Sequence, residues 1–133
     1  MKDYEKLNPS SLPRPTGYTH GIVAPNGRLL FVAGQIGCDT NGMLATGGLV
    51  PQFEKALENV LAVVRDAGGT PESITRMTIY TSSMTAYRTS LRELGIVWRP
   101  LMGKHYPVMA VLGVASLFDP GALVEIEATA VLS

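Results

Sequence analysis

Two glutamates near the C-terminal end of the chain are the residues whose types and spacing best suit acid–base chemistry. Glu125 and Glu127 are separated by one residue in an alternating segment, so both side chains would lie on one face of a strand. A carboxyl group beside an apolar pocket is harder to ionise, which raises its pKa toward the range of a general acid. The alternative is that both glutamates are ordinary solvated or paired strand residues, and of the two we assign a site role to Glu125 only.

The other side chains that could do chemistry are few and isolated. The two histidines, His20 and His105, are far apart in the chain, and Cys38 is the single cysteine. They supply neither the spacing of a metal site nor a disulfide framework. The glycines also lack the pattern of a phosphate-binding loop. We therefore predict no metal, no cofactor, and a buried or turn position for Cys38.

Composition argues against several classes of partner. The 11 basic residues balance 11 acidic ones, whereas nucleic-acid binding usually requires a basic surplus. The longest apolar run is too short for a membrane span, and the N-terminus lacks the apolar region of a signal peptide. We therefore expect a cytoplasmic protein that binds neither nucleic acid nor membrane. Only 17% of the residues are charged, which favours burial of some surface against copies of the same chain.

The elements that must position these residues alternate between strands and helices. Strands are predicted at residues 19–24, 29–33, 77–82, 107–114 and 123–132, and helices at residues 49–67 and from 85 to about 98. The first helix is the clearest, because its apolar residues recur at three- and four-residue steps and Gly68-Gly69 ends it. Pro25-Asn26-Gly27 predicts a hairpin between the first two strands. Pro100 would end or bend the second helix.

The order β-β-α-β-α-β-β predicts an α+β fold in one domain, residues 1–133, with an irregular lead-in over residues 1–17. One sheet would carry both helices on one face. The other face would include Ala33, Met109 and Val111, which suit water poorly. Burial of this face between subunits is the simpler expectation.

Five segments, taken in order, resemble the Rid family of reactive-intermediate deaminases, also called the YjgF-type family. They span nearly all of residues 17–131. They are Gly17-Tyr18-Thr19-His20-Gly21, Phe31-Val32-Ala33-Gly34-Gln35-Ile36, Ala56-Leu57-Glu58-Asn59-Val60 with Ala67-Gly68-Gly69, Pro107 with Val114-Ala115, and Val124-Glu125-Ile126-Glu127-Ala128.

The resemblance implies a chorismate-mutase-like fold and a homotrimer whose sheets form a central barrel. It also implies three small-molecule pockets at the subunit interfaces. In the better-known members these pockets hydrolyse enamines and imines released by pyridoxal-phosphate enzymes, without metal or cofactor. We expect the same architecture here.

Met109 is the most informative departure from the family pattern. The family has an arginine two residues after the conserved proline, and its guanidinium clamps the substrate carboxylate. Counting from Pro107 places Met109 at this position, and a thioether has neither charge nor donor. Met109 as plain core filling is the competing interpretation. A displaced arginine from a neighbouring subunit, at Arg14, Arg88 or Arg99, would restore the clamp.

The remaining positions of the family pocket match unevenly. Tyr18 matches the pocket tyrosine, and Glu125 matches a glutamate thought to help position the attacking water. The resemblance implies three further substrate-binding positions. Ala33 stands where the family has a small polar residue, Val111 where it often has cysteine, and Ser90 where it often has asparagine. The implied pocket keeps its tyrosine and glutamate but becomes more apolar.

Three functions are compatible with these residues. The first is hydrolysis of a reactive enamine or imine other than the standard 2-imino acids. The second is a non-catalytic trimeric protein that binds a small metabolite in the same pockets. The third, endoribonuclease activity, is disfavoured by the balanced charge and by the lack of a paired acid and base.

Overall fold

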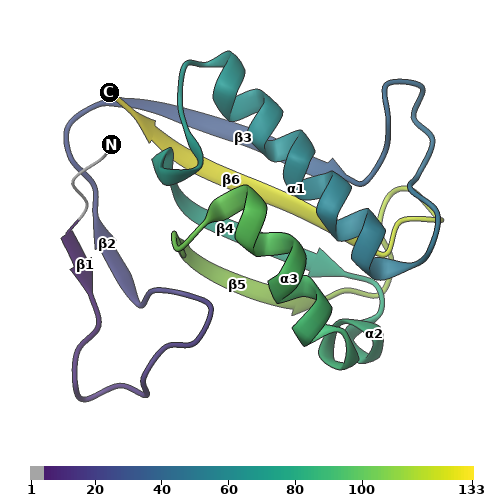
Figure 1. The fold of residues 1–133 in the computed structure, drawn as a ribbon, viewed down its shortest axis with the longest axis horizontal. Coiled ribbons are helices and arrows are strands. Elements are labelled where there is room, and N and C mark those ends of the chain that lie inside the picture. The colour runs from purple at the N-terminus through teal and green to yellow at the C-terminus, as the bar shows by residue number, and fades with distance from the viewer. Residues whose placement is uncertain (1–4) are drawn as a thin grey trace.

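A four-stranded sheet carries the helices of the chain on one of its faces (Figure 1). The computed structural model describes residues 5–133. The sheet consists of β3 (Arg28–Ile36), β4 (Ile74–Thr81), β5 (Val108–Gly113) and β6 (Val124–Leu132). The helices are α1 (Leu49–Asp66), a short 3-10 turn η1 (Pro71–Ser73), α2 (Met84–Thr89) and α3 (Leu91–Met102). Two short strands, β1 (Glu5–Leu7) and β2 (Gly21–Val23), form a separate ribbon.

The sheet is mixed, with the strand order β3-β6-β4-β5. β6 pairs antiparallel with both β3 and β4, whereas β4 and β5 run parallel. Parallel strands need a crossover, and α2 and α3 supply it between β4 and β5. The chain therefore has the α+β fold that the element order predicts, with β5 at one edge of the sheet.

The core lies between the sheet and the helices α1 and α3. The predicted apolar stripe of this helix is buried, and its members include Phe53, Leu57 and Leu61. Each such side chain contributes about 1.5–3 kcal/mol by leaving water. Gly68, with a φ of 86°, ends the helix in the left-handed region as the sequence indicates. Among the described residues, no helix is both long and apolar enough to cross a membrane.

The predicted hairpin at Pro25-Asn26-Gly27 is wrong. β2 pairs with β1, while β3 pairs with β6 from Arg28 opposite Leu132 onward. Asn26 has no positive φ, so it does not adopt the turn geometry that makes Asn-Gly a hairpin signal. The lead-in over residues 1–17 is also not wholly irregular, because Glu5–Leu7 forms β1.

The second predicted helix is divided in two at Ser90. This residue follows α2 and precedes α3, and its backbone amide donates to the carbonyl of Tyr87. Pro100 does not end α3, which continues to Met102 and ends at Gly103. After the break, α3 lies over β4 and β5, whereas α2 lies beyond the ends of these strands (Figure 1).

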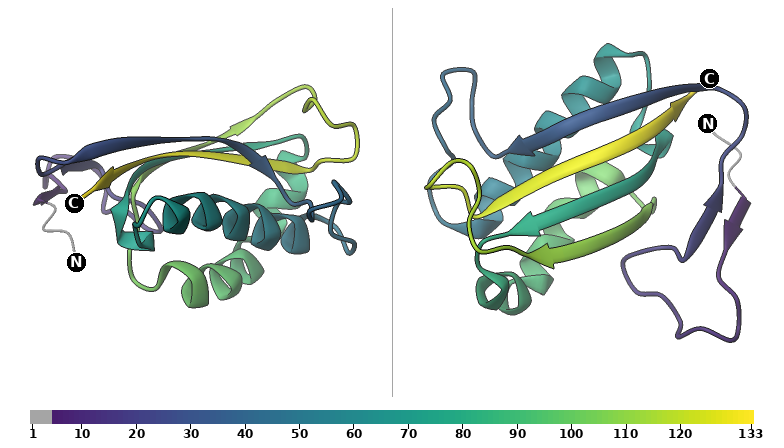
Figure 2. Two further views of the ribbon diagram at one scale, coloured as in Figure 1. Left: turned by 90° about the horizontal axis from the view of Figure 1, so that it is seen from above. Right: turned by 180° about the vertical axis from the view of Figure 1, so that it is seen from behind.

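The sheet has one face covered by helices and one open face (Figure 2). The prediction that Met109 and Val111 belong to the open face is wrong. In the parallel register Met109 lies opposite Met77 and Val111 opposite Ile79, and both partners are buried in the core under the helices. The intervening Ala110 and Leu112 therefore belong to the open face.

The open face has exposed apolar side chains beside a polar cluster. Leu29 is 62% exposed, Phe31 74% and Leu112 47%. Tyr80, on the same face, donates a hydrogen bond from its hydroxyl to Glu127 at 2.7 Å. Exposed apolar surface of this kind typically marks an interaction site.

Candidate functional site

A cavity of about 350 Å³, which we call the edge pocket, lies between α3 and the edge strand β5 and is also lined by Tyr87 of α2. Its walls are mostly aromatic and aliphatic, and none of the described residues that line it carries a charge. They are Thr16, Gly17, Tyr18, Phe53, Ile79, Tyr87, Leu91, Leu94, Gly95, Trp98, Tyr106, Met109 and Val111. The volume is at the lower end of the range for small-molecule sites.

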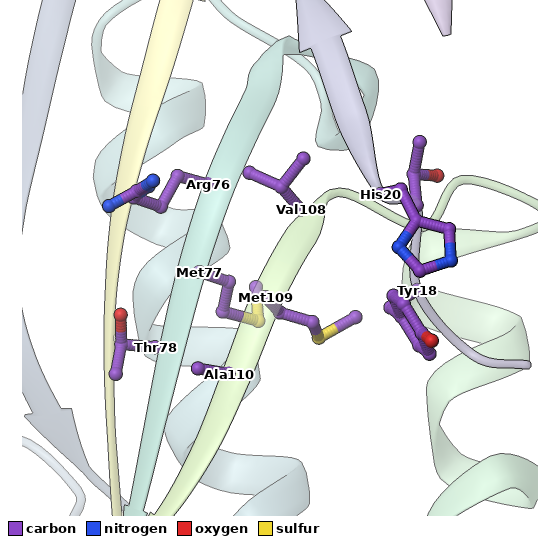
Figure 3. Close-up of a pocket in the computed structure, with 9 residues that line it drawn as sticks. Tyr18, His20, Arg76, Met77, Thr78, Val108, Met109 and Ala110 are labelled. Carbon is purple, nitrogen blue, oxygen red and sulfur yellow. The ribbon is translucent and has the colours of Figure 1, made fainter. Parts of the chain in front are cut away.

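A second cavity of about 310 Å³, the outer pocket, lies on the other side of the same edge (Figure 3). Tyr18 and Met109 line both cavities, so they form the partition between them. Arg76 is the one Lys, Arg, Asp or Glu side chain among the described residues that line the outer pocket. Its guanidinium is directed away from Met109, toward β6 (Figure 3).

Tyr18 is held at the edge of β5 by its neighbour Thr19. The Thr19 hydroxyl donates to the carbonyl of Tyr106 at 2.6 Å, and the Thr19 amide donates to the carbonyl of Pro107 at 3.3 Å. The Tyr18 ring also meets the His20 ring edge to face, with centroids 5.1 Å apart. His20 in turn is fixed through Nε2 to the carbonyl of Pro13 at 2.7 Å. The segment before β2 therefore closes one side of both pockets.

Met109 reaches the partition because of its place in β5. It is half-buried on the helix-covered face, and its thioether extends toward the Tyr18 ring (Figure 3). Val111, two residues later, lies on the same face and lines the same cavity. A methionine here supplies polarisable apolar contact and no hydrogen-bond donor.

Two aromatic pairs form much of the wall of the edge pocket. Trp98 and Tyr106 stack with centroids 5.8 Å apart and planes within 5° of parallel. Phe53 and Tyr87 meet edge to face at 6.2 Å. Burial raises the pKa of Tyr87 to about 12, so its phenol remains a neutral hydrogen-bond donor at physiological pH.

Glu125 lies apart from the edge pocket, on the open face of the central strand β6. It pairs with Tyr80 on one side and Ile36 on the other. Its carboxylate lies against Gly34, where an added Cβ would overlap it. The hydrogen bond to Glu127, the second glutamate of the cluster, raises the pKa of the Tyr80 phenol because a phenolate would lose this bond and face the carboxylates.

The predicted site residues thus fall in three places. Tyr18, Met109 and Val111 share the edge pocket. Ala33 and Glu125 lie at or beside the irregular part of β3, between Val32 and Gln35, on the open side. Ser90 does not line the edge pocket, but its neighbours Tyr87 and Leu91 do.

Sequence reasoning missed the aromatic walls and Arg76. In the sequence, Tyr87 and Trp98 have the spacing of one apolar face of a helix, which is the same signal that a core stripe gives. Arg14, Arg88 and Arg99 are exposed, and none of them lines the edge pocket within this chain. Among residues 5–133, no group of three or more His, Cys, Asp and Glu side chains could hold a metal ion.

Comparisons with known proteins agree with this fold over almost the whole chain. The family model described as Endoribonuclease L-PSP matches residues 10–132. A RutC family protein of Pyrococcus horikoshii is 30% identical over 128 residues, covering 95% of this chain and 96% of the relative. A human 2-iminobutanoate/2-iminopropanoate deaminase is 27% identical over 105 residues, which are 78% of this chain and 73% of that protein.

A crystal structure gives the same result in three dimensions. A Rid protein of unknown function from Yersinia pestis superposes with a TM-score of 0.86, at 30% identity, and covers 97% of this chain and 98% of its own. The family that the five sequence segments indicate is therefore confirmed, and the chain belongs to the Rid family, also described as the RutC or Endoribonuclease L-PSP family.

Proposed function

We propose that this protein hydrolyses a reactive enamine or imine whose anchoring group is uncharged, at pockets formed in a homotrimer. One observation carries the proposal: Met109 stands where the family resemblance implies a carboxylate-binding arginine, in a pocket whose described lining has no charged side chain. Within one chain, none of the described lining residues is a cation that would compensate a bound substrate carboxylate for its lost hydration, which costs several kcal/mol. The standard 2-imino acids are therefore poor substrates.

Hydrolysis of an imine requires few catalytic side chains. Water adds to the carbon of the C=N bond, a proton passes to nitrogen, and ammonia leaves as the carbonyl forms; an enamine first takes a proton at carbon. Tyr18 has a hydroxyl that can hydrogen-bond the substrate at the partition between the two pockets. Glu125 is the group we assign to orient the water. Positioning alone accelerates such a reaction, because imines already hydrolyse in water.

Only in the proposed trimer would Glu125 lie near an edge pocket, which would be that of a neighbouring subunit. In a single chain Glu125 and Ala33 lie on the open side of the sheet, whereas Tyr18 and Met109 lie at its β5 edge. Packing the open faces of three chains around a central axis would bury Leu29, Phe31 and Leu112 and bring Glu125 of one subunit toward the edge pocket of the next. The apolar exposure of this face supports that arrangement.

A non-catalytic binding protein is the second candidate. It is favoured by the position of Glu125, because residues 5–133 of one chain supply the edge pocket with tyrosines but no carboxylate, histidine or cysteine.

Ammonia release separates the two candidates. An amine oxidase acting on 2-phenylethylamine generates an imine with no carboxylate, and the release of ammonia is followed with and without the protein. We expect acceleration over the spontaneous rate, a large loss of it in Glu125→Gln, and little change in Glu58→Gln, an exposed control on α1. Binding without acceleration would leave the non-catalytic function in its place.

A further inference from the structure

The edge pocket is larger than the imine of a short amino acid requires. Its volume is about 350 Å³. An apolar cavity of about 150 Å³ is already enough to hold benzene. A small imine would therefore leave much of the edge pocket empty, and its few carbon atoms would make little contact with the walls. The space suits a substrate with a bulky substituent.

Aromatic rings form the inner wall of the edge pocket. Trp98 stacks on Tyr106, and this pair fixes the plane of both rings. Phe53 meets Tyr87 edge to face. Trp98 is 6% exposed and Phe53 is 2% exposed, so both belong to the deep part of the lining. Aromatic rings and the thioether of Met109 pack favourably against a further flat ring, so this wall suits an aromatic substituent.

Gly95 widens the mouth of the edge pocket. Gly95 and Leu91, one helical turn earlier, are both exposed and both line the cavity, so they lie where it opens to solvent. Gly95 is inside α3, where glycine is a poor helix former. Neither a positive φ nor a close neighbour requires glycine, since an added Cβ would meet nothing within 4 Å. The fold therefore gives no reason for this glycine, whereas entry of a wide group does.

The two pockets differ in polarity on either side of the partition. Polar side chains line the outer pocket, among them Thr19, His20 and Thr78 (Figure 3). The described lining of the edge pocket has no charged side chain. A substrate whose C=N bond lies at Tyr18 can therefore direct an apolar substituent into the edge pocket. Its reacting end would then face the outer pocket, where water and ammonia find hydrogen-bond partners.

We propose that the edge pocket holds an aromatic substituent of the substrate, and that Gly95 determines how large a substituent it admits. The substrate class is an arylalkyl imine or enamine without a carboxylate, such as the imine of 2-phenylethylamine. The reaction rests on the proposed function, but the preference for an aromatic group does not, because the binding of an unreactive analogue reveals it.

Binding is measured with phenylacetamide and acetamide, two uncharged probes that differ by a phenyl ring. Trp98 is the single tryptophan of the chain and lines the pocket, so its fluorescence reports occupancy. Burial of the ring should make phenylacetamide bind at least about tenfold more tightly than acetamide. Gly95→Leu should abolish most of this gain, because its side chain narrows the mouth, and leucine favours the helix, so the variant should fold. Ala62→Leu adds the same side chain at an exposed position of α1 and should leave phenylacetamide binding unchanged.

Turnover tests the same preference with the imines that an amine oxidase forms from 2-phenylethylamine and from propylamine. Gly95→Leu should lower kcat/KM for the aromatic imine at least about tenfold, mainly through KM, and change that for the small imine less than about twofold. Equal binding of the two amides, or phenylacetamide binding that survives Gly95→Leu, would overturn the proposal. Phenylacetamide binding as expected, without ammonia release from either imine, would instead refute the proposed hydrolysis and leave the ligand class standing.

Discussion

Replacing Met109 with arginine should give the pocket a preference for carboxylates. The side chain at this position is half-buried and extends toward Tyr18, so a guanidinium there would lie at the partition between the two pockets (Figure 3). Hydrogen bonds to a charged group contribute about 1.5–3 kcal/mol. Each 1.4 kcal/mol is tenfold, so kcat/KM for a 2-imino acid should rise about ten- to hundredfold.

The assay is ammonia release from 2-iminobutyrate and 2-iminopropionate generated by an amino-acid oxidase. Met109→Leu is the matched control, because it keeps an apolar side chain of similar volume and should cost less than about 1.5 kcal/mol in stability without gaining activity. Thermal unfolding of each variant shows that the fold is intact. A folded Met109→Arg protein with no gain on either acid would refute the placement of Met109 at the anchoring position.

Three further changes test other contacts. Gly34→Ala should lower the free energy of unfolding by about 1–3 kcal/mol, because its Cβ overlaps the Glu125 carboxylate, and Glu125→Ala in the same chain should recover most of the loss in urea denaturation. Gly95→Ala should raise the free energy of unfolding by about 0.5–1 kcal/mol, because glycine is unfavourable inside a helix and the added Cβ would meet nothing within 4 Å; a loss of stability would contradict this expectation. Burial raises the pKa of Tyr87 from 10.0 to about 12, so its neutral form is favoured by folding. That contribution, roughly 2–3 kcal/mol, is complete below pH 10 and lost as the pH rises from 10 to 12; Tyr87→Phe should show a shallower alkaline decline in urea midpoints across this range.

The helices and strands that have strong local patterns could be predicted from the sequence. The stripe of α1 is buried as its period indicates, and Gly68 ends the helix. The hairpin failed because Pro25-Asn26-Gly27 is a local signal, whereas the partner of β3 is β6, about a hundred residues further along the chain. The long-range pairing of β3 with the buried strand β6 therefore outweighs the local preference of Asn-Gly for a hairpin turn.

The site could be predicted only in part. The alternation of side chains along a strand predicts that Met109 and Val111 share one face, and both line the edge pocket with Tyr18. Which face this is depends on the parallel register of β4 and β5, which no local pattern reveals. For the same reason the sequence did not show that Glu125 is separated from the pocket within one chain.

The aromatic wall of the edge pocket could not be predicted, because its residues have the regular spacing of a buried helix face. Tyr87, Leu94 and Trp98 have the spacing of a core helix, and Leu94 and Trp98 are indeed buried. Only the break at Ser90 and the position of α3 over the edge strand turn part of this stripe toward a cavity. The helical period of apolar residues does not show whether a side chain is buried in the core or lines a cavity.

The most direct test of the central claim compares two imines that differ only in the carboxylate: one from 2-phenylethylamine and an amine oxidase, the other from phenylalanine and an amino-acid oxidase. The quantity to measure is the ratio of kcat/KM for the two with the unmodified protein. An uncharged anchoring site predicts a ratio of at least ten in favour of the imine without the carboxylate. A ratio below one would show that a cation holds the carboxylate after all, and would contradict the account of the Met109 pocket.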